Sequence, residues 1–96
     1  MSLLTLKLAL KKYVKNEIKI KYPNDLYING KKISGILNEI IFFNKKRFLV
    51  IGIGVNISNN PIIENYPTAN LNQFSDKKIS KFSILNNIKN TYKYKY

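Results

Sequence analysis

The sequence predicts an α+β fold in which helices pack on one face of a mixed or antiparallel sheet. Two segments, residues 2–16 and 76–90, repeat apolar side chains at helical spacing near the ends of the chain. Segments of strand character lie between them. Asn29-Gly30, the residue pair that most favours a two-residue hairpin turn, joins two of these strands. These observations indicate an antiparallel meander of about three to five strands.

The first helix is predicted over residues 2–16, with Ser2 as a possible N-cap. Its apolar side comprises Leu3, Leu6, Ala9, Leu10, Tyr13 and Val14. Leu4 and Leu8 fall on the polar side instead. Their position indicates contact with something that the chain does not supply.

The strands are predicted at residues 17–21, 26–28, 31–43 and 47–58. Pro23 follows the first of them and ends it. The last is almost continuously apolar, which predicts a central position in the sheet with both faces covered. An irregular stretch is predicted over residues 59–75, and the second helix over 76–90, with Ser75 or Asp76 as its cap.

The composition excludes several classes of site. The 96 residues, enough for one small domain, include no cysteine and no histidine, which excludes disulfides, zinc sites and a Ser-His-Asp triad. The net charge is +12, but the lysines are dispersed and accompany abundant Asn and Ile, as A/T-rich codons would produce. A nucleic-acid partner is therefore not favoured. No apolar run is long enough to span a bilayer, so we expect a cytoplasmic location and no membrane contact.

The corner after the first strand places a lysine beside proline, asparagine and aspartate. Pro23 restricts its own backbone and that of Tyr22, while Asn24 and Asp25 favour a tight turn. The ordinary interpretation is a solvent-exposed Lys21 at a strand end. The alternative is a ligand-binding corner, in which a stiff backbone holds the lysine where it stabilises anionic oxygens.

The segment Gly52-Ile53-Gly54 invites two interpretations. It lacks the third glycine and the following helix of a dinucleotide-binding fingerprint, so that function is rejected. Either the glycines are tolerated in a central strand or, because alternate residues share a face, they leave a smooth groove for a flat ligand. Gly35 in the preceding strand similarly marks a bulge or a close approach by another group.

Three ordered motifs resemble those of a known family, the biotin protein ligases. The stretch "KYPNDLYINGKKISGILNE" resembles that family's Lys-Trp-Pro-Asn-Asp corner, hairpin and Gly-Ile-Leu-x-Glu strand, with Tyr22 in place of the usual tryptophan. "VIGIGVNIS" resembles its Gly-x-Gly-x-Asn strand, and "YPTANL" its Ala-Thr-Ser-Leu element. The resemblance covers about residues 3–90 and implies the central portion of a class II synthetase-like catalytic domain.

The resemblance implies a two-step reaction. Biotin and ATP, with Mg²⁺, form biotinyl-5′-adenylate, and the biotinyl group then passes to a lysine of the biotin carboxyl carrier domain of a carboxylase. Lys21 is implied as the catalytic residue, in contact with the biotin carboxylate and the adenylate phosphate. The implied binding residues are Lys21, Leu26, Gly35, Gly52, Ile53, Gly54 and Asn56, with Asn56 near the nucleotide. Pro23, Asn24 and Asp25 are implied as the structural corner, and no protein ligand to a metal is implied.

Two departures from the family pattern keep alternatives open. The sequence contains no Gly-Arg-Gly segment before the lysine and nothing that resembles the C-terminal small barrel of many relatives. We therefore expect residues 1–96 to form one partial catalytic domain, with a strand edge open to a homodimer or to a partner that supplies the missing half. The alternatives to a ligase are a degenerate remnant that acts as a binding module and, less favoured, a basic nucleic-acid-binding domain.

Overall fold

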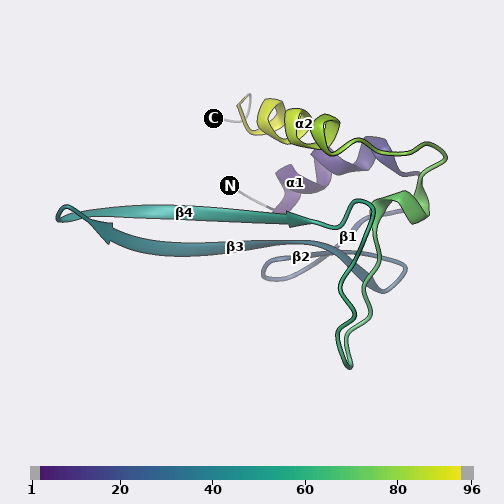
Figure 1. Cartoon of the computed structure of the whole chain (residues 1–96), viewed down its shortest axis with the longest axis horizontal. Helices are drawn as coiled ribbons and strands as arrows, with labels where there is room; N and C mark the ends of the chain where they lie inside the picture. The colour runs from purple at the N-terminus through teal and green to yellow at the C-terminus, as the bar shows by residue number, and fades with distance from the viewer. Residues whose placement is uncertain (1–2, 94–96) are drawn as a thin grey trace.

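A four-stranded antiparallel sheet organises residues 3–93, the part of the chain that this computed structural model describes. Its strands are β1 (Lys19–Lys21), β2 (Asp25–Ile28), β3 (Lys31–Phe43) and β4 (Lys46–Val55). Each strand pairs with the next one in the chain, in the order β1-β2-β3-β4 (Figure 1). The predicted α+β fold with an antiparallel sheet is confirmed.

Two tight turns fix the register of the longer strands. Asn29 and Gly30 connect β2 to β3 with φ angles of 51° and 74°, and Asn44 and Lys45 connect β3 to β4 with φ angles of 50° and 63°. Positive φ at both central residues is the geometry of a type I′ turn, whose twist matches that of the flanking strands. The predicted Asn-Gly hairpin is thus confirmed.

Helix α1 (Leu3–Leu10) is shorter than the helix predicted from the apolar pattern. A 3₁₀ turn, η1 (Lys11–Tyr13), follows it, and Val14 is already extended, with φ of −134° and ψ of 149°. Tightening of the last turn is a common way for a helix to end, since it satisfies some of the final carbonyl groups. Ser2, the predicted N-cap, lies outside the described residues.

Helix α2 (Lys81–Lys93) begins later than predicted. Ser80 caps it, because its Oγ accepts from the backbone N–H groups of Phe82 and Ser83 at 3.2 and 3.5 Å. Ser75, one of the predicted caps, instead bonds to Lys77 in a local turn. No helix in the described part of the chain is long and apolar enough to cross a membrane.

The two helices lie side by side on one face of the sheet and enclose the core (Figure 1). The completely buried large side chains are Leu6, Leu10, Ile18, Leu26, Ile28, Ile33 and Leu71. The helix pair also joins the two ends of the chain. The Asn87 amide donates to the Ala9 carbonyl, and the hydroxyls of Tyr13 and Ser83 lie 2.8 Å apart.

The predicted central position of the last strand is wrong, because β4 is the edge strand of the described sheet. The pairing of β2 with β3 ends at Gly35, so β3 and β4 project beyond it as a two-stranded hairpin (Figure 1). Apolar side chains on this projection, among them Phe42 and Leu49, are exposed. An apolar run indicates that a strand needs covering, but it does not say which residues cover it.

Candidate functional site

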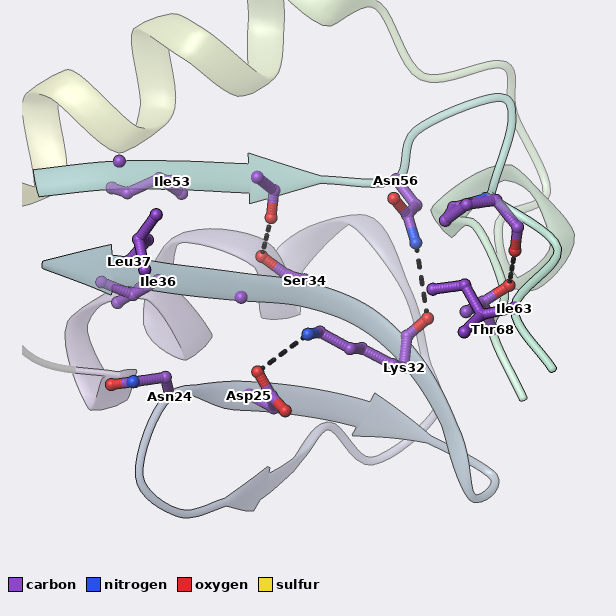
Figure 2. Close-up of a pocket in the computed structure, with 14 residues that line it drawn as sticks. Asn24, Asp25, Lys32, Ser34, Ile36, Leu37, Ile53, Asn56, Ile63 and Thr68 are labelled. Atoms are coloured by element: carbon purple, nitrogen blue, oxygen red, sulfur yellow. Dashed lines mark hydrogen bonds and ion pairs between the residues drawn. The ribbon is translucent and has the colours of Figure 1, made fainter. Parts of the chain in front are cut away.

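The open face of the sheet, opposite the helices, carries the candidate site. Directly paired residues of two antiparallel strands point to the same face. Ile36 pairs with Ile53 and both contact the core, so the pairs on either side of them face away from the helices. Those neighbouring pairs are Gly35 with Gly54 and Leu37 with Gly52. A cavity of about 680 Å³ lies over them (Figure 2).

Three glycines leave the floor of this cavity without side chains. A Cβ placed on Gly54 would meet no heavy atom within 4 Å, and one on Gly52 would come no closer than 3.7 Å to the Leu37 carbonyl oxygen. Gly35 differs, because a Cβ there would lie 3.1 Å from Asp25 Oδ1 and 3.2 Å from Lys32 Cε. Of the two interpretations of Gly35, the structure therefore supports a close approach by other side chains.

Lys32 and Asp25 stand at one end of the glycine floor (Figure 2). Lys32 Nζ lies 3.0 Å from Asp25 Oδ1, and the two side chains are 29% and 25% exposed. The other carboxylate oxygen, Oδ2, accepts from the Tyr66 hydroxyl at 3.1 Å. Lys32 Nζ also lies 5.5 Å from the centre of the Tyr66 ring. The ammonium is thus held in place and still open to the cavity.

The surroundings keep both Lys32 and Tyr66 protonated. Partial burial disfavours the charged lysine, but the hydrogen bond and the Coulomb attraction of Asp25 outweigh it, so the pKa of Lys32 lies above its ordinary value of 10.5. The pKa of Tyr66 is raised by interaction with the Tyr27 hydroxyl, by desolvation and by Asp25, although Lys32 opposes the shift. The site therefore offers a cation and a neutral phenol at neutral pH.

Backbone contacts fix the position of Lys32. Its N–H donates to the Pro67 carbonyl at 3.0 Å, and its carbonyl accepts from the Ala69 N–H at 2.9 Å. The Asn56 side-chain amide, at the end of β4, donates to the Ala69 carbonyl at 3.1 Å and to the Lys32 carbonyl at 3.4 Å. These bonds tie the loop after β4 to β3 and give the cavity its second wall, which includes Ile63 (Figure 2).

Most of the residues that the sequence singled out come together here. Those that line the cavity are Asn24, Asp25, Gly35, Gly52, Ile53, Gly54 and Asn56. Pro23 occupies the corner before β2, where its peptide bond with Tyr22 is cis. Asn56 was expected near the nucleotide. Its side-chain amide donates to the backbone carbonyls of Lys32 and Ala69, so the residue helps to hold the loop that forms the second wall of the cavity.

Two of the predicted binding residues lie elsewhere. Leu26 is completely buried in the core, because the strand alternation that turns Asp25 towards the cavity turns Leu26 towards the helices. Lys21 pairs with Asp25 across β1 and β2, but its side chain is exposed and does not line the cavity. Its Nζ lies 5.1 Å from the centre of the Tyr27 ring.

Lys32, the lysine that does line the cavity, was not predicted as a site residue. A signal was available, since a two-residue turn at Asn29-Gly30 sets the register and places Lys32 opposite Tyr27. The bulge between Leu26 and Tyr27 then shifts the pairing, so that Gly35 and not Ser34 lies opposite Asp25. Without that bulge, the proximity of Lys32, Asp25 and Gly35 does not follow from the sequence.

Comparison with known proteins identifies the family to which this chain belongs. Residues 1–56, more than half of the chain, match the model of the Biotin/lipoate A/B protein ligase family. The chain belongs to that family. The solved structure of the biotin protein ligase from Aquifex aeolicus, without ligand, is similar with a TM-score of 0.75 and 27% identity, over 95% of this chain and 41% of that one.

Two further relatives agree with this assignment. Biotin–protein ligase 2 of Arabidopsis thaliana is 48% identical over 44 residues, which are 46% of this chain and 13% of that protein. The bifunctional ligase/repressor BirA of Bacillus subtilis is 36% identical over 76 residues, which are 72% of this chain and 23% of that protein. The chain thus spans less than a quarter of the length of these curated relatives.

Proposed function

We propose that this chain provides the biotinyl-adenylate site of a biotin–protein ligase. The observation that carries the proposal is the Lys32 ammonium, held by Asp25 at the end of a groove floored by glycines. Among the solved relatives, the enzyme from Leishmania major is in complex with biotinyl-5-AMP, and that from Aquifex aeolicus with biotin and ATP. These ligands combine ring systems, which a smooth floor accommodates, with an anionic group that an ammonium attracts.

In the first step, a carboxylate oxygen of biotin attacks the α-phosphorus of MgATP. A carboxyl–phosphate bond forms, the bond to the β-phosphate oxygen breaks, and pyrophosphate leaves. Negative charge gathers on the non-bridging phosphate oxygens. The Lys32 ammonium neutralises that charge, and it is most effective when it is oriented before the reaction, as its contact with Asp25 ensures. Magnesium enters with ATP as part of the substrate.

In the second step, a lysine amine of the carrier domain attacks the biotinyl carbonyl. The bond between the biotinyl carbonyl carbon and the phosphate oxygen breaks, AMP leaves with the bonding electrons on that oxygen, and an amide bond forms as the nitrogen gives up a proton to solvent water. Lys32 again faces the charge that develops on that phosphate. The carrier is the biotin carboxyl carrier domain of a carboxylase.

A binding module without transfer is the second candidate. The cavity lies on the uncovered face of the sheet, so water reaches both the adenylate and the ammonium. Water weakens the electrostatic stabilisation of the transition state and hydrolyses a reactive acyl-adenylate. We expect the 96 residues alone to bind biotinyl-5′-adenylate weakly and to show little transfer.

Titration calorimetry with biotinyl-5′-adenylate at fixed salt tests the site. We expect Lys32→Met, which keeps the apolar stem, to weaken binding by a factor of about 10 to 150, because one charge-assisted contact is worth roughly 1.5–3 kcal/mol. Lys45 lies in the turn between β3 and β4, away from the cavity, so the matched control Lys45→Met should leave the affinity unchanged. Lys21→Met tests which of the two lysines contacts the adenylate. If Lys21 has the role predicted from the sequence, its substitution should lower the affinity more than Lys32→Met does.

The outcomes separate a site from general charge attraction. Equal losses in the Lys32 and Lys45 variants would mean that the +12 charge alone attracts the anion, and the proposed site would be withdrawn. A large loss in the Lys21 variant with none in the Lys32 variant would move the site to the rim formed by β1. Circular dichroism of each variant confirms that the fold is retained.

A further inference from the structure

The chain between β4 and the 3₁₀ turn η2 (Leu71–Phe74) leaves the sheet as a long, narrow loop (Figure 1). We call residues 60–68 the rim loop, because Pro61, Ile63 and Thr68 line the candidate cavity. Ile62 stands between two of these residues but does not line the cavity, and its side chain is completely exposed. The rim loop therefore has one side on the ligand groove and presents Ile62 to the outside.

Hydrogen bonds close the rim loop at its base. The Asn60 side-chain amide donates to the Thr68 hydroxyl at 2.7 Å, and that hydroxyl donates to the Pro61 carbonyl at 2.5 Å. The Asn70 side-chain amide donates to the Asn60 side-chain oxygen at 2.9 Å. A loop that its own bonds hold in one conformation loses little conformational entropy when a partner binds to it.

The far end of the rim loop is a tight turn that reaches back to the site. Asn65 has a φ angle of 61°, and the Tyr66 N–H donates to the Ile63 carbonyl at 3.3 Å. The Tyr66 hydroxyl then donates to Asp25 at 3.1 Å. These contacts fix the position of Ile62 relative to the polar end of the cavity.

The transfer step of the proposed ligase brings a second protein to this place. The carrier lysine has to attack the biotinyl carbonyl in the cavity, and a lysine side chain has a stem of only four carbons. The backbone of the carrier must therefore come up to the mouth of the cavity and touch the surface beside it. The rim loop is one wall of this mouth, and it holds a large apolar side chain, Ile62, fully in the solvent.

We propose that the rim loop is a docking contact for the carrier domain, with Ile62 as the anchor that fills an apolar hollow beside the target lysine. Glu64, also exposed, follows at the tip and is one of only five acidic residues in the chain. The complementary surface of the carrier therefore combines an apolar hollow with a cationic group. The inference rests on the proposed ligase function, because that function brings a carrier to the cavity.

Two other roles fit the rim loop less well. A lid closes over its ligand by moving, whereas this loop is bonded at its base and to Asp25, and Ile62 does not face the cavity. A contact between two copies of the chain is opposed by a charge of +12 on each copy.

Cross-linking tests where the carrier docks, because the chain contains no cysteine and a single one serves as the only attachment point. The probe is an unbiotinylated carboxylase carrier domain with one cysteine beside its target lysine. We expect Ile62→Cys to cross-link to this domain through a short bismaleimide at least tenfold faster than Lys45→Cys. Lys45 is the control because it lies in the turn between β3 and β4, away from the cavity.

Titration of the same carrier domain measures what the anchor contributes. Ile62→Asp should weaken binding at least tenfold, because it places a charge in an apolar contact. Phe82→Asp is the matched control, since it makes the same change of charge at a 69% exposed side chain on α2, on the other face of the sheet. It should leave binding unchanged. Neither residue lines the cavity, so both variants should keep their affinity for biotinyl-5′-adenylate.

Three results would overturn the docking contact. Equal losses in the two aspartate variants would assign the binding to charge alone, and full binding by Ile62→Asp would place the carrier on another surface. A wild-type chain that does not bind the carrier domain would also exclude it. The carrier domain is titrated without biotin or ATP, so failure of this contact is distinguished from failure of the ligand site, which calorimetry with biotinyl-5′-adenylate reports.

Discussion

At the scale of single residues, Asp25 positions the polar side chains at the end of the cavity. Its two carboxylate oxygens hold different partners, Lys32 on one side and Tyr66 on the other. This arrangement orients the ammonium without hiding it, because the lysine side chain remains 29% exposed. Gly35 makes the contact possible, since any side chain at that position would press against both charged groups.

The raised pKa of Lys32 predicts how the proposed anion binding depends on pH. Asp25 favours the protonated lysine, so its contribution is fully present below the ordinary value of 10.5 and is lost as the pH rises through the higher pKa of the folded chain. We expect affinity for biotinyl-5′-adenylate to stay level from about pH 6 to about pH 9. Titration calorimetry across this range, at fixed salt, measures it.

The Lys32→Met variant provides the comparison for that profile. It should bind more weakly and show no fall in affinity at high pH that can be assigned to the lysine. A fall between neutral pH and about pH 9 in the wild type, absent from the variant, would contradict a raised pKa for Lys32.

At the scale of elements, the two halves of β4 differ in structure, although the sequence of both halves is apolar. Its second half, with Gly52 and Gly54, forms the floor of the cavity, and its first half, with Phe48 and Leu49, exposes apolar side chains in the projecting part of the hairpin. From the apolar sequence of both halves we expect a strand that is covered on both faces. Only the structure shows which half of the strand lacks side chains and which half exposes large apolar ones.

Gly54→Val tests the smooth floor directly. A Cβ at Gly54 meets nothing within 4 Å, so the strand should tolerate valine and gain up to about 1 kcal/mol over glycine in urea unfolding. The side chain would rise into the cavity, and we expect adenylate affinity to fall at least about tenfold. Asn38→Val adds the same side chain on the other face and should leave affinity unchanged. Undiminished binding by Gly54→Val would exclude the floor as the ligand surface.

At the scale of the whole molecule, the sequence predicts local features better than their combination. Asn29-Gly30 and the alternation around it define the hairpin, because turn chemistry acts over a few residues. The glycine floor follows from strand periodicity as well. The Lys32 site does not, since it depends on a bulge, and neither does the edge position of β4, since that depends on which strands pair and not on how apolar each strand is.

The helix pair that joins the chain ends has a consequence for the order of folding. Each strand pairs with its neighbour in sequence, so the sheet forms from short-range contacts, whereas the bond from Asn87 to Ala9 spans 78 residues. We expect this closure to form after the rate-limiting transition state. Asn87→Ala should therefore leave the refolding rate unchanged and speed unfolding about fivefold, the kinetic equivalent of one hydrogen bond of roughly 1 kcal/mol. Stopped-flow chevron measurements decide it, and slower refolding would mean that the chain ends meet early.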